Sequence, residues 1–117
     1  MRPLARVVED DHAEVPTAAI QGEIDASNTD DIAARLRRLV TNRSEALVVD
    51  LVATTYIDSA GINLLFELDT ELRQRQQRLH LVVAESSPIE RMIGITGLAG
   101  AVPVHPTLAA AVRAASA

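Results

Sequence analysis

The sequence predicts an α/β domain in which about four helices cover a mixed sheet of four to five strands. Strand-like and helix-like segments alternate along the chain after two strand-like runs at its start, an order typical of α/β folds. The 117 residues are 48% hydrophobic, which suits one domain with a well-formed core. Aromatic residues make up only 2% of the chain, so we expect an aliphatic core. We expect residues 1–117 to form a single domain.

The first two strands are expected to pair as an antiparallel hairpin. Residues 4–8 and 17–24 favour strands, and the polar residues 9–14 between them favour a turn that contains His12.

A helix is predicted directly after the hairpin. Ser27 and Asn28 are residue types that cap helices, and the acids that follow favour the positive end of the helix dipole. Apolar residues then recur at helical spacing from Ile32 until the helix ends near residues 41–42. Four arginines lie on its other faces and at its end, and we interpret them as a solvated surface rather than a binding patch: Arg35, Arg37, Arg38 and Arg43.

Two buried strands and a second helix are predicted in the middle of the chain. Residues 46–52 form a continuous apolar run, typical of a central strand that is parallel to its neighbour. Residues 57–61 lead into a helix whose apolar positions run from Ile62 to Leu72 and which ends at about Gln77. Residues 79–84 are predicted to form another buried strand.

The carboxyl-terminal part is expected to contribute two more helices. Ser87, Pro88 and Glu90 form a capping box with proline at the first helical position, and Gly94 and Gly97 end that helix. Residues 102–104 favour a short last strand, and residues 108–115 favour a final helix that follows His105, Pro106 and Thr107.

Composition excludes several classes of function. Sixteen acidic residues against eleven basic ones give a net charge of −5, which disfavours nucleic acid as a direct partner. The chain has no cysteine and no lysine, so thiolate metal sites, cysteine nucleophiles and lysine Schiff bases are impossible. No apolar run is long enough to span a membrane and no signal peptide is evident. We expect a cytoplasmic protein that has no cofactor, no bound metal and no membrane contact.

The turn around Ser59 is the strongest candidate for chemistry. Asp58 and Ser59 follow the central strand and precede a helix, whose free amide groups favour a phosphate carried by Ser59 or by a partner. The alternative is that one of these two side chains is a plain helix cap and that Gly61 only permits close packing. A serine hydrolase is disfavoured, because Ile57 replaces the first glycine of the nucleophile elbow and His12, His80 and His105 are scattered along the sequence.

Three short segments carry a resemblance to a known family. They are Gly22-Glu23-Ile24-Asp25, Val48-Val49-Asp50-Leu51 and Tyr56-Ile57-Asp58-Ser59-Ala60-Gly61-Ile62, with residues 79–83, the Ser87-Pro88 helix and the Pro106-Thr107-Leu108 helix continuing the match in order. The chain resembles the STAS family, and within it the bacterial anti-sigma factor antagonists. Many members have a second hydroxyl after the motif serine and a glycine in the first helical turn, where this chain has Ala60 and Asn63.

The resemblance implies a regulatory binding protein, not an enzyme. It implies that the unphosphorylated form binds an anti-sigma factor serine kinase and releases the sigma factor, that this kinase phosphorylates Ser59, and that a serine phosphatase reverses the modification. The alternative is a regulatory STAS domain of an anion transporter or a subunit of a stress-sensing scaffold. The oligomeric state is left open. The resemblance implies a partner-binding surface made of Asp25, Ser27, Asn28, Asp58, Ser59, Gly61 and Asn63.

Overall fold

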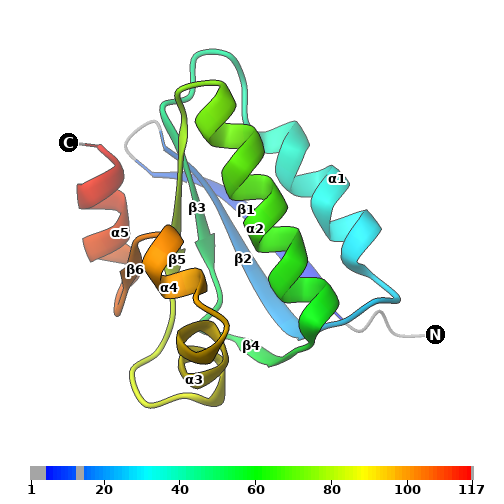
Figure 1. Ribbon diagram of the computed structural model, residues 1–117. Helices are drawn as coiled ribbons and strands as arrows, with labels where there is room; N and C mark the ends of the chain where they lie inside the picture. The colour runs from blue at the N-terminus through cyan, green and yellow to red at the C-terminus, as the bar shows by residue number, and fades with distance from the viewer. Residues whose placement is uncertain (1–4, 13–14, 117) are drawn as a thin grey trace.

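A mixed sheet runs through the centre of the computed structural model, which describes residues 5–12 and 15–116 (Figure 1). Its strand order is β1-β2-β3-β5-β6, and β4 pairs with β2 off this path. β1 and β2 are antiparallel, whereas all other pairs are parallel. The strands are β1 (Ala5–His12), β2 (Val15–Ile24), β3 (Ala46–Asp50), β4 (Thr54–Ile57), β5 (Arg78–Val82) and β6 (Val104–His105). The helices are α1 (Thr29–Leu39), α2 (Ser59–Gln74), α3 (Pro88–Ile95), α4 (Leu98–Ala101) and α5 (Leu108–Ala115).

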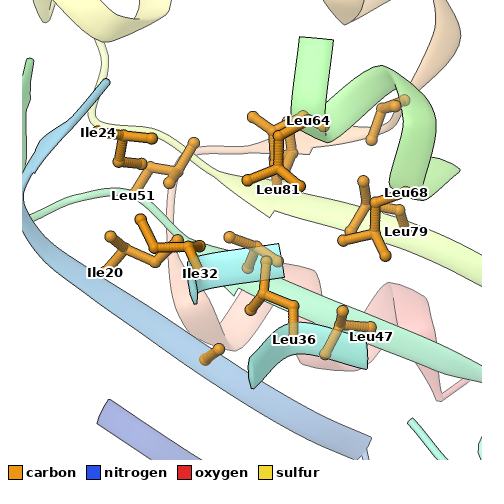
Figure 2. Packing of buried hydrophobic residues seen from close by; sticks show 14 of the residues in the cluster. Ile20, Ile24, Ile32, Leu36, Leu47, Leu51, Leu64, Leu68, Leu79 and Leu81 are labelled. Atoms are coloured by element: carbon orange, nitrogen blue, oxygen red, sulfur yellow. The ribbon is translucent and has the colours of Figure 1, made fainter. Parts of the chain in front are cut away.

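The main core lies between the sheet and the α1 and α2 helices. Figure 2 shows Ile32 and Leu36 of α1 and Leu68 of α2 pointing toward strand residues such as Leu47 and Leu79. These side chains are all 3% exposed or less. Burial of aliphatic side chains of this size contributes about 1.5–3 kcal/mol each, so this layer supplies most of the stability.

α5 covers the opposite face of the sheet and forms a smaller, separate cluster. Its buried residues Ala111 and Ala115 pack with Val48 of β3 and Val82 of β5. The partly buried Leu108 and Val112 of α5 pack against this cluster, which has fewer buried residues than the main core.

The predicted α/β class is confirmed, and the described residues contain one strand and one helix more than the prediction counted. The two observed elements that the sequence did not predict are β4 and α4. Two elements also end earlier than the sequence predicts, for identifiable reasons. The central strand ends at Asp50, because its Oδ1 accepts a hydrogen bond from the amide of Val52 (2.9 Å) and turns the chain. α2 ends at Gln74, because Gln76 adopts a positive φ of 55° and the Gln77 amide bonds back to Leu72 O.

The predicted hairpin forms, but its turn is shorter than the sequence suggested. β1 continues to His12, which pairs with Val15, so residues 9–12 belong to the strand and the placement of His12 in the turn is wrong. Leu4, where the first strand was expected to begin, and residues 13–14 of the expected turn lie outside the described residues.

Two of the α1 arginines connect elements at the surface. Arg37 forms two hydrogen bonds to the Glu71 carboxylate of α2, at 3.0 and 3.1 Å, and this contact raises the pKa of Arg37. Arg35 donates to Val7 O of β1 at 3.3 Å. About half of the Arg37 side chain remains exposed, so the pair contributes at most about 1 kcal/mol.

Candidate functional site

Ser59 is the first residue of α2 and is exposed to solvent. The preceding Asp58 is the helix cap: its backbone is extended and its Oδ1 accepts a hydrogen bond from the amide of Gly61 at 3.0 Å. Within the described part of the chain, the Ser59 hydroxyl has no hydrogen-bond partner. The capping role thus belongs to Asp58, which leaves the Ser59 hydroxyl free to react.

Asp58 also connects two turns of the chain. Its second oxygen, Oδ2, accepts a hydrogen bond from the amide of Ala26 at 3.2 Å. Its own amide donates to Ile24 O at 3.2 Å. The turn that carries Ser59 is therefore attached to the loop between β2 and α1 by both backbone and side chain.

The loop between β2 and α1 is held by its own polar side chains. Asp25 Oδ1 accepts hydrogen bonds from the amide of Ser27 (2.8 Å) and from its hydroxyl. Asn28 Oδ1 accepts from the amide of Asp25 (3.0 Å), and Asn28 Nδ2 donates to Glu23 O (2.8 Å). Asn28 occupies the cap position of α1 without a side-chain capping bond. The prediction that Ser27 and Asn28 cap the helix is therefore wrong: their side chains fix the loop.

Gly61 is buried beneath the site, where its surroundings leave no room for a side chain. A Cβ atom there would lie 2.6 Å from Ile57 Cγ1 and 2.9 Å from Ile24 Cγ2. Glycine at this position lets the first turn of α2 pack directly on β2 and β4. This geometry supports the close-packing interpretation of Gly61, and its assignment to a partner-binding surface stays a prediction.

Asn63 lies one helical turn beyond Ser59 and is exposed, so the two side chains share one face of α2. The structure thus brings Asp25, Ser27, Asn28, Asp58 and Ser59 to one end of the sheet, with Asn63 beside them.

The surface around Ser59 is negatively charged. Asp25 and Asp58 form no ion pair within the residues that the structure describes. The positive end of the α2 dipole and the free amides of its first turn partly compensate this charge. The arrangement can accommodate a phosphate on Ser59, and that phosphate would stand beside carboxylates.

Two exposed apolar side chains on the segment before Ser59 were missed by the sequence analysis. Val52 was counted in a buried strand but is 52% exposed, because the chain turns at Asp50. Tyr56 lies on β4 and is 49% exposed. Nothing in the sequence indicates that Val52 is exposed, whereas Tyr56 could have been singled out as the chain's only tyrosine.

The histidines are scattered along the sequence, but the fold brings two of them together. His80 Nδ1 and His105 Nε2 lie 3.0 Å apart, because β5 and β6 are parallel neighbours. The pair lies on the face that α5 covers, whereas Ser59 begins α2 on the other face (Figure 1). No recorded contact joins a described histidine to Ser59, and the described residues contain no cluster of three potential metal ligands.

None of the described helices has the length and apolar character that crossing a membrane requires.

Comparisons with known proteins agree with the fold. BtrV, a candidate anti-sigma factor antagonist of Bordetella bronchiseptica, is 31% identical over 98 residues, which are 83% of each chain. An anti-sigma factor antagonist from Mycobacterium paratuberculosis superimposes with a TM-score of 0.86 at 26% identity, over 97% of this chain and 95% of that one.

The fold also matches SpoIIAA in two chemical states. The unphosphorylated form superimposes with a TM-score of 0.71 at 17% identity, over 92% of this chain and 93% of that one. The phosphorylated Bacillus form superimposes with a TM-score of 0.65 at 19% identity, over 92% of this chain and 97% of that one. The sequence model of the STAS domain matches residues 7–111, and the chain belongs to the STAS domain family.

Proposed function

We propose that the chain is a cytoplasmic anti-sigma factor antagonist whose activity is switched by phosphorylation of Ser59. The unphosphorylated form binds an anti-sigma factor that is also an ATP-dependent serine kinase, and this binding releases the sigma factor. The kinase transfers a phosphate to Ser59, the phosphorylated form dissociates, and a serine phosphatase regenerates the active form.

The observation that carries this proposal is the free hydroxyl of Ser59 at the exposed start of α2. A serine that caps a helix must give up a bond before it can react, but here Asp58 provides the cap. The names of the relatives support the antagonist role, and the phosphorylated form of SpoIIAA supports the modification. The same names favour this role over that of a transporter's regulatory domain or a scaffold subunit.

The electrostatics of the site explain how a phosphate could act as a switch. The modification adds about −1.5 to −2 charges at a helix N-terminus, where free amides and the dipole tolerate them, so the fold should persist. The same charge stands next to Asp58 and close to the Asp25 loop. An anionic partner surface at this end of the sheet, such as the part of a kinase that carries ATP, would be repelled, at a cost of about 1–3 kcal/mol. Binding is weakened while folding is kept.

The role is regulatory and not catalytic. The side chains that surround Ser59 are carboxylates engaged with backbone amides, and the histidine pair lies on the other face of the sheet. Among the residues that the structure describes, no side chain is hydrogen-bonded to the Ser59 hydroxyl as a base would be, so Ser59 is better suited to receive a phosphate from a kinase that supplies its own base.

Incubation with candidate anti-sigma factors and ATP, followed by intact mass measurement, tests the acceptor. The wild-type chain should gain one phosphate and the Ser59→Ala chain none. Ser27→Ala is the matched control, because Ser27 is an exposed neighbouring hydroxyl already bonded to Asp25, and its phosphorylation should equal that of wild type. Phosphate on the Ser59→Ala chain would refute the assignment.

A further inference from the structure

His80 of β5 and His105 of β6 form a hydrogen-bonded pair between neighbouring parallel strands. Their ring nitrogens Nδ1 and Nε2 are 3.0 Å apart, and the rings are stacked with centroids 5.2 Å apart at 26°. His80 is only 8% exposed. One nitrogen must donate a hydrogen and the other must accept it, so the contact needs at least one neutral ring.

β6 and α5 are attached to the sheet through a smaller cluster than the main core. β6 has only two residues and pairs with β5 at Leu81–Val104 and Val82–His105, and backbone hydrogen bonds from Leu81 N to Pro103 O and from Val83 N to His105 O accompany this pairing. α5 packs through the buried Ala111 and Ala115 and the partly buried Leu108 and Val112. Elements with few buried apolar contacts open at lower free energy than the main core.

We propose that the His80–His105 pair is an acid-sensitive clasp that holds β6 and α5 on the sheet, and that protonation of both rings releases these two elements while the main core stays folded. A single added proton preserves the bond, because an imidazolium can donate to a neutral ring. Two imidazolium rings present only N–H donors at 3.0 Å and repel each other.

The direction of the pH effect follows from the burial of the pair. Burial, then the neighbouring His105 and Arg78, hold the pKa of His80 below its ordinary value of 6.5. The opened form regains the ordinary value, so it binds more protons than the closed form. The closed form is therefore favoured above pH 6.5 and loses its advantage as the pH falls below that value toward the lowered pKa of His80.

Other charged groups around the pair set how readily it takes up protons. Glu45 and Arg78 line the cavity of about 380 Å³ that contains His80, with Ala114 and Ala115 of α5. Glu85 and Glu90 line the cavity that contains His105. Of these groups, the guanidinium of Arg78 opposes a positive charge on His80 and so lowers its pKa, in the same direction as burial. Two further charges lie on the elements packed against the pair: Asp50 at the end of β3, and the exposed Arg113 of α5.

Hydrogen exchange of the full chain, measured by mass spectrometry and corrected for intrinsic rates, tests the clasp. Between about pH 7 and about pH 5, protection of residues 103–116 should fall by up to about tenfold per unit of pH, while α2 keeps its protection. In the double variant His80→Asn/His105→Gln, side-chain amides replace the two facing nitrogens and do not titrate, so protection of α5 should not depend on pH. His12→Gln is the matched control and should behave as wild type.

Equal pH dependence in wild type and double variant would overturn the proposal, as would simultaneous loss of protection in α2. If the double variant does not fold, an NMR titration of the imidazole carbons of the wild-type chain tests the proposal instead. Coupled titration of His80 and His105 with the His80 midpoint below 6.5 supports the clasp, whereas independent titration of both rings contradicts it. The inference does not depend on the role of Ser59.

Discussion

The substitution Gly61→Ala examines whether the turn that carries Ser59 requires glycine for packing. The new Cβ would lie 2.6 Å from Ile57 Cγ1 and 2.9 Å from Ile24 Cγ2. Favourable carbon–carbon contacts are about 3.5–4.0 Å, so both isoleucines must move by the better part of an ångström. They are 2% and 1% exposed, and the branch atoms concerned are not the free ends of flexible chains.

The expected loss of stability is the difference of two opposing effects. Overpacking of this severity costs about 2–3 kcal/mol, toward the upper end of measured values. Alanine in place of glycine in a helix recovers up to about 1 kcal/mol. The free energy of unfolding should therefore fall by about 1–3 kcal/mol.

Gly94→Ala is the matched control, since Gly94 also lies in a helix but has no atom within 4 Å of the position of a Cβ. It should leave stability unchanged or raise it by up to about 1 kcal/mol. Urea denaturation followed by circular dichroism measures the free energy of unfolding of both variants, and its slope against urea concentration should be the same in each. If Gly61→Ala were as stable as the wild type, the close-packing explanation of Gly61 would be refuted.

Two further pairs of substitutions test the hydrogen bonds around the sheet by the same urea assay. Asp58→Ala should lower the free energy of unfolding by about 1–2 kcal/mol, which is more than the loss for Ser87→Ala at the cap of α3, because Asp58 also accepts a hydrogen bond from the amide of Ala26. Equal losses in the two variants would contradict a connecting role for Asp58. Gln77→Ala should lower the free energy of unfolding by about 1–3 kcal/mol, because the buried side-chain amide of Gln77 donates hydrogen bonds to two carbonyls of the α1–β3 loop. Substitution of the exposed Gln74 by alanine should change it by at most about 0.5 kcal/mol. A Gln77→Ala chain as stable as wild type would show that water replaces those bonds.

The elements that the sequence predicts well are those with a strong periodic signal. α1 and α2 have apolar positions at helical spacing, and β3 is a continuous apolar run, so local pattern decides their type. β4 is different, because its four residues form a strand only through pairing with Gly22–Ile24 of β2, about thirty residues earlier in the chain. α4 is a single turn that follows Gly97 at a positive φ of 82°, too short for a pattern to develop.

The candidate site could be located from the sequence, but its hydrogen bonds could not. The position of Ser59 at a helix start follows from the chain order, whereas the choice of Asp58 as the cap depends on backbone geometry. The bond from Ala26 to Asp58 joins residues 32 positions apart, and the His80–His105 contact joins residues 25 apart. Ser27 and Asn28 show the same limit, since residue types that cap helices also fix loops.

A phosphate on Ser59 is proposed to weaken partner binding without unfolding the chain. The most direct test is calorimetric titration of the cognate anti-sigma factor with the unphosphorylated chain and with the chain phosphorylated at Ser59, alongside the circular dichroism melt of each. Phosphorylation should lower the affinity about 5- to 150-fold, equivalent to about 1–3 kcal/mol, with the melting transition retained. Equal affinity of the two forms, or loss of binding together with loss of the folded signal, would contradict this proposal.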